Sequence, residues 1–74
     1  MVELVKYMVD GLVDNKDAVE ITMKGEDVIN VKVDKNDLGK VIGKDGRIAK
    51  AIRTIVKAVG NKRQIKYTVV ILEE

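Results

Sequence analysis

A bend that contains two glycines and is flanked by cations is the part of this 74-residue sequence best suited to chemistry. Gly43 and Gly46 are separated by two residues. Lys44 lies between them, and Arg47 follows. Because glycine has no Cβ, a ligand can come close to the backbone of such a bend. The amide groups at the start of a following helix attract anions, so these cations predict a phosphate as the ligand.

Aliphatic residues on both sides of the bend recur at helical spacing. The upstream set is Leu38, Val41 and Ile42. The downstream set is Ile48, Ile52, Ile55 and Val59. Each glycine inside a helix costs about 1 kcal/mol relative to alanine, so two of them mark a break between two helices. We predict a short helix that is capped by Asp34 or by Asn36-Asp37 and ends at Ile42. The second helix covers about residues 47–58, with Gly60 in the position that ends it.

The second helix is two-sided at 100° per residue. Its apolar side holds Ile48, Ala51, Ile52, Ile55, Val56 and Val59. Its cationic side holds Arg47, Lys50, Arg53 and Lys57. A charged helix face is most often only solvated, but the neighbouring bend makes Arg47 and Lys50 candidate phosphate contacts. Arg53 and Lys57 are expected to add long-range attraction.

Patterns elsewhere predict the order helix, strand, strand, helix, helix, strand. Residues 2–14 are apolar at helical spacing, and Tyr7 is expected to pack at the edge of that stripe. Residues 18–24 and 28–33 alternate and are joined by a short loop with a glycine, which predicts a hairpin. Residues 64–72 predict a last strand. The order predicts an α+β fold with helices on one face of the sheet.

Composition predicts one globular domain that covers residues 1–74. The chain is 46% hydrophobic and 35% charged, and it lacks cysteine and histidine. Without these residues there is no disulfide framework, and the usual zinc ligands and the commonest general base are missing. No apolar run is long enough to cross a membrane, and no secretory signal is evident. We therefore expect a cytoplasmic protein without metal, cofactor or membrane partner.

The net charge of +2 hides an uneven distribution. Residues 35–63 contain nine basic and two acidic residues, a net charge of +7. The rest of the chain contains five basic and ten acidic residues, a net charge of −5. Such asymmetry indicates a polyanionic partner on one side of the molecule.

The bend and its frame resemble the KH domain, a module that clamps single-stranded RNA or DNA. Residues 41–48 read VIGKDGRI, which is similar to the core signature of that family. The longer run DLGKVIGKDGR at residues 37–47, followed by AKAIR at residues 49–53, resembles the small bacterial single-KH proteins of the KhpA type. Because the extra helix and strand come first, the order is similar to the type II topology. That topology implies a three-stranded sheet covered on one face by three helices.

The resemblance implies that the Gly-x-x-Gly loop grips the sugar-phosphate backbone of about four nucleotides. Gly43 and Gly46 would allow close approach, while Lys44 and Arg47 would contact phosphate. Ile42 and Ile48 flank the loop and are candidates to line a groove for bases, although the sequence does not separate groove from core. The predicted RNA-binding set is Lys40, Ile42, Gly43, Lys44, Asp45, Gly46, Arg47, Ile48 and Lys50. Within it the carboxylate of Asp45 opposes a phosphate.

Other glycine motifs fit poorly. A P-loop needs four residues between its first glycine and the Gly-Lys pair, but only three separate Gly39 from Gly43. A dinucleotide fingerprint would need a third glycine at Val41. Tyr7 and Tyr67 are the only aromatic residues, which disfavours modules that stack bases on exposed aromatic rings.

We therefore expect a non-enzymatic protein that binds single-stranded RNA with little sequence specificity. The resemblance further implies an RNA chaperone or global RNA binder, as a homodimer or as a heterodimer with a second KH protein of the KhpB (Jag-like) type. The alternative is a protein–protein interaction or dimerisation module whose nucleic-acid binding is incidental.

Overall fold

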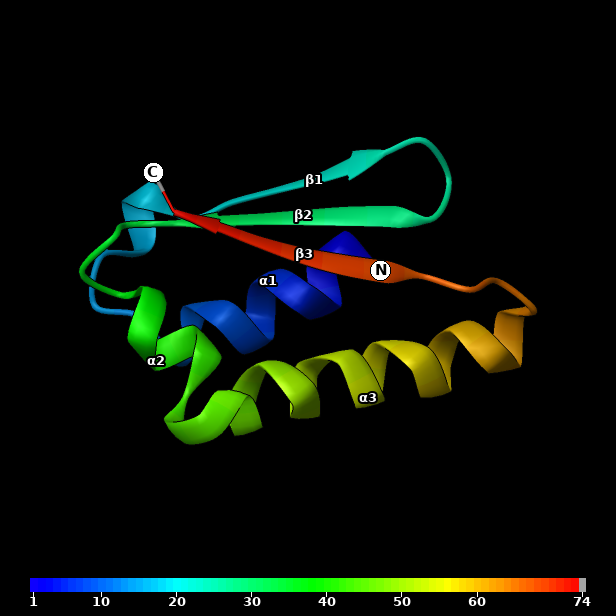
Figure 1. Ribbon diagram of the computed structural model, residues 1–74. Coiled ribbons are helices and arrows are strands. Elements are labelled where there is room, and N and C mark those ends of the chain that lie inside the picture. The colour runs from blue at the N-terminus through cyan, green and yellow to red at the C-terminus, as the bar shows by residue number, and fades with distance from the viewer. Residues whose placement is uncertain (74) are drawn as a thin grey trace.

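The computed structural model describes residues 1–73 and shows a three-stranded sheet with the α-helices on one of its faces (Figure 1). The elements are α1 (Val2–Asp10), β1 (Glu20–Lys24), β2 (Val28–Val33), α2 (Leu38–Ile42), α3 (Arg47–Arg63) and β3 (Thr68–Glu73). Two single turns of 3-10 helix precede β1 and α3, η1 (Lys16–Ala18) and η2 (Lys44–Gly46). This order confirms the predicted type II α-β-β-α-α-β arrangement.

The strand order β1-β2-β3 leaves β3 at one edge of the sheet. β1 and β2 form the predicted antiparallel hairpin, in which Thr22 lies opposite Asn30. Gly25 has φ +71° in its turn, a value that favours glycine. β3 lies parallel to β2, with Val70 opposite Asn30, so the chain between these strands crosses over through α2 and α3. The crossover brings the bend between the two helices to the same side of the molecule as the free edge of β3 (Figure 1).

The core lies between the sheet and the helices. The alternating residues Ile29, Val31 and Val33 of β2 are at most 1% exposed. The residues that pack with them are Val5, Val9, Val13, Val19, Val41, Ile52, Val56 and Val69. Each such side chain contributes about 1.5–3 kcal/mol when fully buried, so this small aliphatic core holds the helices on the sheet.

The first helix ends four residues earlier than predicted. α1 stops at Asp10, and Gly11 follows as its C-terminal cap. The amide groups of Asp14 and Asn15 donate to the carboxylate of Asp37, which draws this segment away from the helix axis. A long-range polar contact therefore overrides the helical pattern of residues 11–14. β1 likewise begins two residues later than predicted, because residues 16–18 form a 3-10 turn.

α3 is longer than predicted, and Gly60 does not end it. The helix continues to Arg63, and Gln64 adopts the left-handed conformation that terminates it (φ 62°). Gly60 is instead buried inside the helix, where its carbonyl accepts a hydrogen bond from the amide of Ile65 at 2.8 Å. Residues 64–67, which were predicted to begin the last strand, form the connection after α3, so β3 begins at Thr68.

Two apolar side chains are more exposed than the helical patterns predict. Tyr7 is 80% exposed and does not pack at the edge of the α1 stripe. Ile55 is 45% exposed, and Ala51 one turn earlier is also exposed. The buried line of α3 is formed by Ala49, Ile52, Val56 and Gly60. The apolar stripe of α3 is therefore wider than the surface that the core covers.

We predict that Gly60→Ala destabilises the protein. A Cβ at this position would lie 2.4 Å from the carbonyl oxygen of Ile65 and 2.9 Å from the ring of Tyr67. Overpacking of this kind costs about 1–3 kcal/mol, which exceeds the gain of roughly 0.5–1 kcal/mol from alanine in a helix. Urea unfolding followed by circular dichroism measures the change. The matched control is Gly39→Ala in α2, where nothing lies within 4 Å and the free energy of unfolding should not fall. Equal stability of Gly60→Ala and the wild type would contradict the steric argument.

Candidate nucleic-acid interface

The loop between α2 and α3 reverses the chain through left-handed backbone conformations. Gly43, Asp45 and Gly46 have φ values of 77°, 57° and 74°. Glycine adopts such values without strain, and aspartate tolerates them better than most residues. The sequence predicted the break between the helices correctly. The left-handed conformation of Asp45 adds a reason for its presence that the sequence pattern did not supply.

The two glycines of the loop differ in the room that a Cβ would have at each position. At Gly46 a Cβ would meet nothing within 4 Å, so the backbone is open to a ligand. At Gly43 a Cβ would lie 2.5 Å from Cγ1 of Ile48, which occupies that space itself. Gly43 thus allows the first turn of α3 to close against the end of α2, and the open approach lies at Gly46.

Hydrogen bonds inside the loop hold its shape. The amide of Gly46 donates to the carbonyl of Gly43 at 3.2 Å, and the amide of Arg47 donates to the carbonyl of Lys44. Free amides were expected at the start of the second helix, but the amides of Gly46 and Arg47 are used within the turn. Asp45 is exposed, and α3 has no side-chain cap, so its carboxylate does not cap the helix. The loop therefore exposes cationic side chains, while two of its amides are used within the turn.

Lys44, Arg47 and Lys50 are exposed on and beside the loop, as the prediction of phosphate contacts requires. Lys40 is placed differently. Its ammonium group contacts the carboxylates of Asp14 and Asp37, and the contact with Asp14 is the main cause of its raised pKa. Lys40 therefore lies near the loop but is held by acidic neighbours.

Asp37 anchors α2 to the rest of the fold. Its side chain is 3% exposed and accepts the amides of Asn15 at 3.0 Å and Asp14 at 3.2 Å, while Lys40 lies 3.4 Å away. The hydrogen bond from the amide of Asn15 is the largest cause that holds the pKa of Asp37 below 3.8. The pKa of Asp34 is also lowered below 3.8, chiefly because its carboxylate accepts a hydrogen bond from the amide of Asn36. Asp37 occupies the predicted N-cap position, but its carboxylate binds a distant segment instead of the helix amides.

The two candidate groove isoleucines differ in exposure. Ile42 is 36% exposed at the end of α2, beside Gly43. Ile48 is half-buried against Gly43 and packs at the margin of the core. Their positions on either side of the loop keep both within the predicted site, and Ile42 offers the larger apolar surface.

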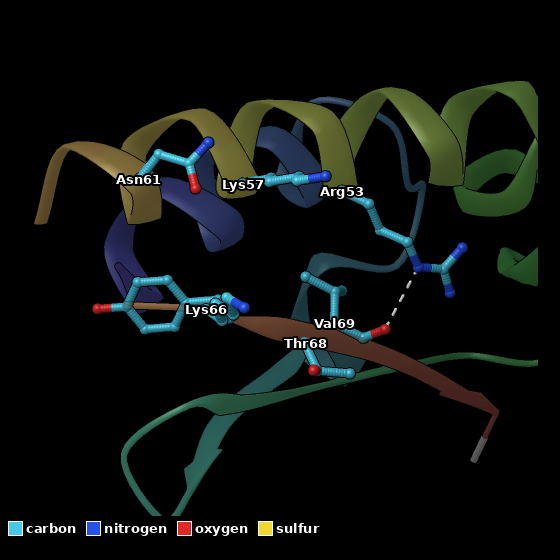
Figure 2. A pocket seen from close by; sticks show the side chains of 7 residues that line it. Arg53, Lys57, Asn61, Lys66, Thr68 and Val69 are labelled. Atoms are coloured by element: carbon cyan, nitrogen blue, oxygen red, sulfur yellow. Dashed lines mark hydrogen bonds between the residues drawn. The ribbon is translucent and has the colours of Figure 1, made fainter. Parts of the chain in front are cut away.

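A groove between α3 and β3 was not predicted from the sequence. Its volume is about 400 Å³. It is lined by Arg53, Lys57, Asn61, Lys66, Tyr67, Thr68 and Val69. Figure 2 shows Arg53 reaching from α3 toward β3, where its Nε donates to the carbonyl of Val69 at 3.4 Å. The spacing of Arg53, Lys57 and Asn61 by four residues was visible in the sequence, but the approach of β3 was not.

Two further features bear on the class of site. No helix within residues 1–73 is long and apolar enough to cross a membrane. Over the same residues, acidic side chains do not gather in a group of three that could hold a metal ion.

The fold and the left-handed Gly-x-x-Gly loop between two helices define a KH domain. The family model for the KH domain of KhpA/KhpB matches residues 2–71, and the chain belongs to this family. This confirms the family resemblance seen in the sequence.

Several relatives are similar over nearly the whole chain. The RNA-binding protein KhpA of Caldanaerobacter subterraneus subsp. tengcongensis is 51% identical over 97% of this chain and all of its own length. The protein of the same name from Aquifex aeolicus is 49% identical over 96% of this chain and 94% of its own. The RNA-binding protein KhpA of Streptomyces coelicolor is less similar, with 43% identity over 81% of this chain and 80% of its own length. No solved structure matches the chain. These relatives are named as binders and not as enzymes, which agrees with the non-enzymatic prediction.

We predict that the Asp37 anchor makes stability depend on pH. Because the pKa of Asp37 is lowered in the folded state, its contribution is complete above about pH 4, near the value for an unfolded chain, and is lost as the pH falls through the folded pKa. Asp37→Asn should lower Tm at neutral pH, and its difference from the wild type should shrink in acid. Thermal unfolding over a pH series measures this, with the exposed Asp17→Asn as control. A difference that stays constant into strong acid would show that the charge of Asp37 is not what matters.

Proposed function

We propose that this protein binds single-stranded RNA with little sequence specificity through the loop between α2 and α3. The observation that carries the proposal is the open left-handed backbone at Gly46 with Lys44 and Arg47 exposed beside it. Such a loop offers positive charge and an uncovered main chain to a sugar-phosphate backbone. The similarity to proteins named RNA-binding protein KhpA supports RNA as the nucleic acid.

Low sequence specificity follows from the groups around the loop. Neither tyrosine belongs to it, since Tyr7 lies on α1 and Tyr67 lies beyond the far end of α3. Bases near the loop would meet Ile42 and the half-buried Ile48. Aliphatic contacts discriminate weakly between bases, whereas phosphate contacts carry no sequence information. A binder of this kind suits the role of an RNA chaperone or global RNA binder in the cytoplasm, and both role and location stay predictions.

We predict that Lys44→Glu/Arg47→Glu abolishes RNA binding without unfolding the protein. Both side chains are exposed, so the fold should tolerate the change, while each lost charged contact is worth about 1.5–3 kcal/mol. Fluorescence anisotropy with a short oligouridylate should show at least a roughly hundredfold loss of affinity. For the wild type, the logarithm of affinity should fall with the logarithm of salt at a slope of about −0.7 per phosphate contact.

The matched control for this experiment is Lys16→Glu/Lys24→Glu. It changes the net charge by the same amount at exposed positions on η1 and β1. The control should keep most of the affinity. If both variants lost affinity equally, the loop would have no special role, and if neither lost any, RNA binding through this loop would be refuted.

We also propose that α3 carries a contact surface for a second KH domain, either another copy or a partner of the KhpB type. Ile55 is 45% exposed in the middle of the longest helix, and it borders a shallow hollow with Ala51 and Thr54. An exposed aliphatic side chain of this size gains free energy when a partner covers it. Arg47 and Lys50 line the same hollow, so two copies would bring like charges together.

We predict that self-association through this surface strengthens as salt increases, because salt screens the like charges. RNA binding should weaken with salt over the same range, so the two activities separate. Sedimentation equilibrium measures the dimer constant, and Ile55→Ser should weaken it. Tyr7→Ser, which removes another exposed side chain, is the control. If Ile55→Ser left the dimer dissociation constant unchanged, the dimer interface would lie elsewhere.

A further inference from the structure

The outer edge of β1 has no partner strand among residues 1–73. In the strand order β1-β2-β3, β1 pairs with β2 alone, so the sheet does not use the main-chain groups along its other edge. Figure 1 shows β1 at the border of the sheet, on the side of the molecule away from α3. All the side chains of β1 are exposed except that of Ile21, which is half-buried. This edge is therefore accessible to another strand.

The edge of β1 lacks most of the features that usually protect a free edge. Proteins use a proline, a bulge, or a covering loop or helix for this purpose. The chain contains no proline, and β1 pairs with β2 without a bulge from Glu20 to Lys24. The other edge of the sheet differs, because Arg53 of α3 contacts the carbonyl of Val69 in β3. What limits pairing at β1 is its short length and the charges of Glu20 and Lys24.

Those two charges are complementary when β1 meets a second copy of itself. The strand reads EITMK, with a carboxylate at one end and an ammonium group at the other. In an antiparallel pair with its two-fold axis at Thr22, Glu20 of each copy lies opposite Lys24 of the other. Opposite charges that face each other across two strands stabilise the pair, whereas like charges destabilise it. The strand is therefore self-complementary in this register.

Neighbouring registers lose the match. A two-fold axis at Ile21 places Glu20 opposite Thr22, which is uncharged. An axis at Met23 brings Glu20 toward Glu26 of the second copy, so that like charges meet. A shift by a single residue turns the helices of the two copies to opposite faces, because side chains alternate along a strand. The charges therefore favour the register with its axis at Thr22.

The same register joins apolar side chains on the helix side of the sheet. Ile21 and Met23 lie opposite two residues of β2 that are buried against the helices. Ile21 packs at the margin of the core, while Met23 is 37% exposed. With the axis at Thr22, Ile21 of each copy lies opposite Met23 of the other. The pair would thus cover apolar surface that Met23 exposes in a single chain.

We propose that β1 pairs with β1 of a second copy of this chain, antiparallel about Thr22, which joins two three-stranded sheets into one. Two strands of this length exchange about four to six main-chain hydrogen bonds. The contact is small, so it is weak by itself and gains strength where copies are already held close together. It leaves the loop and Ile55 free, because both lie on the helix layer (Figure 1). Copies that used β1 and Ile55 together would form larger assemblies.

Disulfide formation tests the register, because the chain has no cysteine of its own. Opposed residues of antiparallel strands have Cα atoms about 4.5–5.5 Å apart, which suits a disulfide. In a glutathione redox buffer, Thr22→Cys should therefore form a disulfide-linked dimer. Glu20→Cys is the control, since two copies of residue 20 would lie about 13 Å apart along the ladder. Its linkage should be at least about tenfold slower, and equal rates would overturn the proposal.

A mixture separates geometry from the loss of charge in that control. Residue 20 of one copy lies opposite residue 24 of the other, so Glu20→Cys and Lys24→Cys chains should link to each other. Neither variant should link to itself at a comparable rate. Mixed and self-linked dimers differ in mass, and mass spectrometry counts them. A random distribution of the three dimers would overturn the register.

Charge reversal tests the complementarity in the Thr22→Cys background. Glu20→Lys sets lysines opposite each other at both ends of the pair and should slow linkage about tenfold. Lys24→Glu should do the same through opposed glutamates. Glu20→Lys/Lys24→Glu restores opposite charges in every pair and should recover the rate, with an unchanged net charge. Rates that followed the net charge of the chain would overturn the proposal.

Two measurements separate this contact from the other proposed surfaces. Linkage of Thr22→Cys should persist when Ile55→Ser is added, and loss of linkage would show that the β1 edges do not pair by themselves. A short oligouridylate occupies one loop, so linked and reduced Thr22→Cys should bind it with equal affinity. A loss of that affinity on linkage would contradict a contact that leaves the loop free. Linkage itself needs no RNA, so failure of RNA binding would leave this test intact.

Discussion

The arrangement of the site depends on the left-handed backbone of the four-residue bend between α2 and α3. Three of its residues have positive φ, and this reversal sets the direction in which α3 leaves α2. The bend can close only because Gly43 has no Cβ, since Ile48 fills the space that a Cβ would need. The same side chain packs at the margin of the core. The open backbone at Gly46 and the packing of α3 are therefore consequences of one local conformation.

The side chain of Asp37 connects the helix before that bend to the segment that follows α1. Its buried carboxylate accepts the amides of Asp14 and Asn15, and Lys40 lies beside it. In this way the segment after α1 is tied to the first turn of α2. One residue of the predicted RNA-binding set, Lys40, thus has a structural partner near the loop. The carboxylates around it reduce the positive charge that it offers to a phosphate.

The order of elements and the position of the bend were predictable because each rests on a local pattern. Period-two and helical spacing identify β2 and α3, and the paired glycines identify the break before Arg47. The errors lie where distant contacts decide the outcome. α1 ends early because Asp37 captures the amides that follow it, and α3 passes through Gly60 because residues 65–67 pack against that glycine. The groove was missed for the same reason, since one of its walls is β3.

The groove beside β3 and the hollow beside Ile55 lie on opposite sides of α3. Ile55 and Lys57 are separated by about 200° around the axis, so a partner on Ile55 does not cover the groove. Arg47 and Lys50 line the hollow beside Ile55 and also lie beside the proposed RNA-binding loop, so a partner at Ile55 and an RNA at the loop would meet the same positive charges. A partner that covered Ile55 would leave both grooves of a pair facing outward. Two linked RNA-binding loops would then raise avidity for one long RNA through effective concentration, without a new contact at either loop.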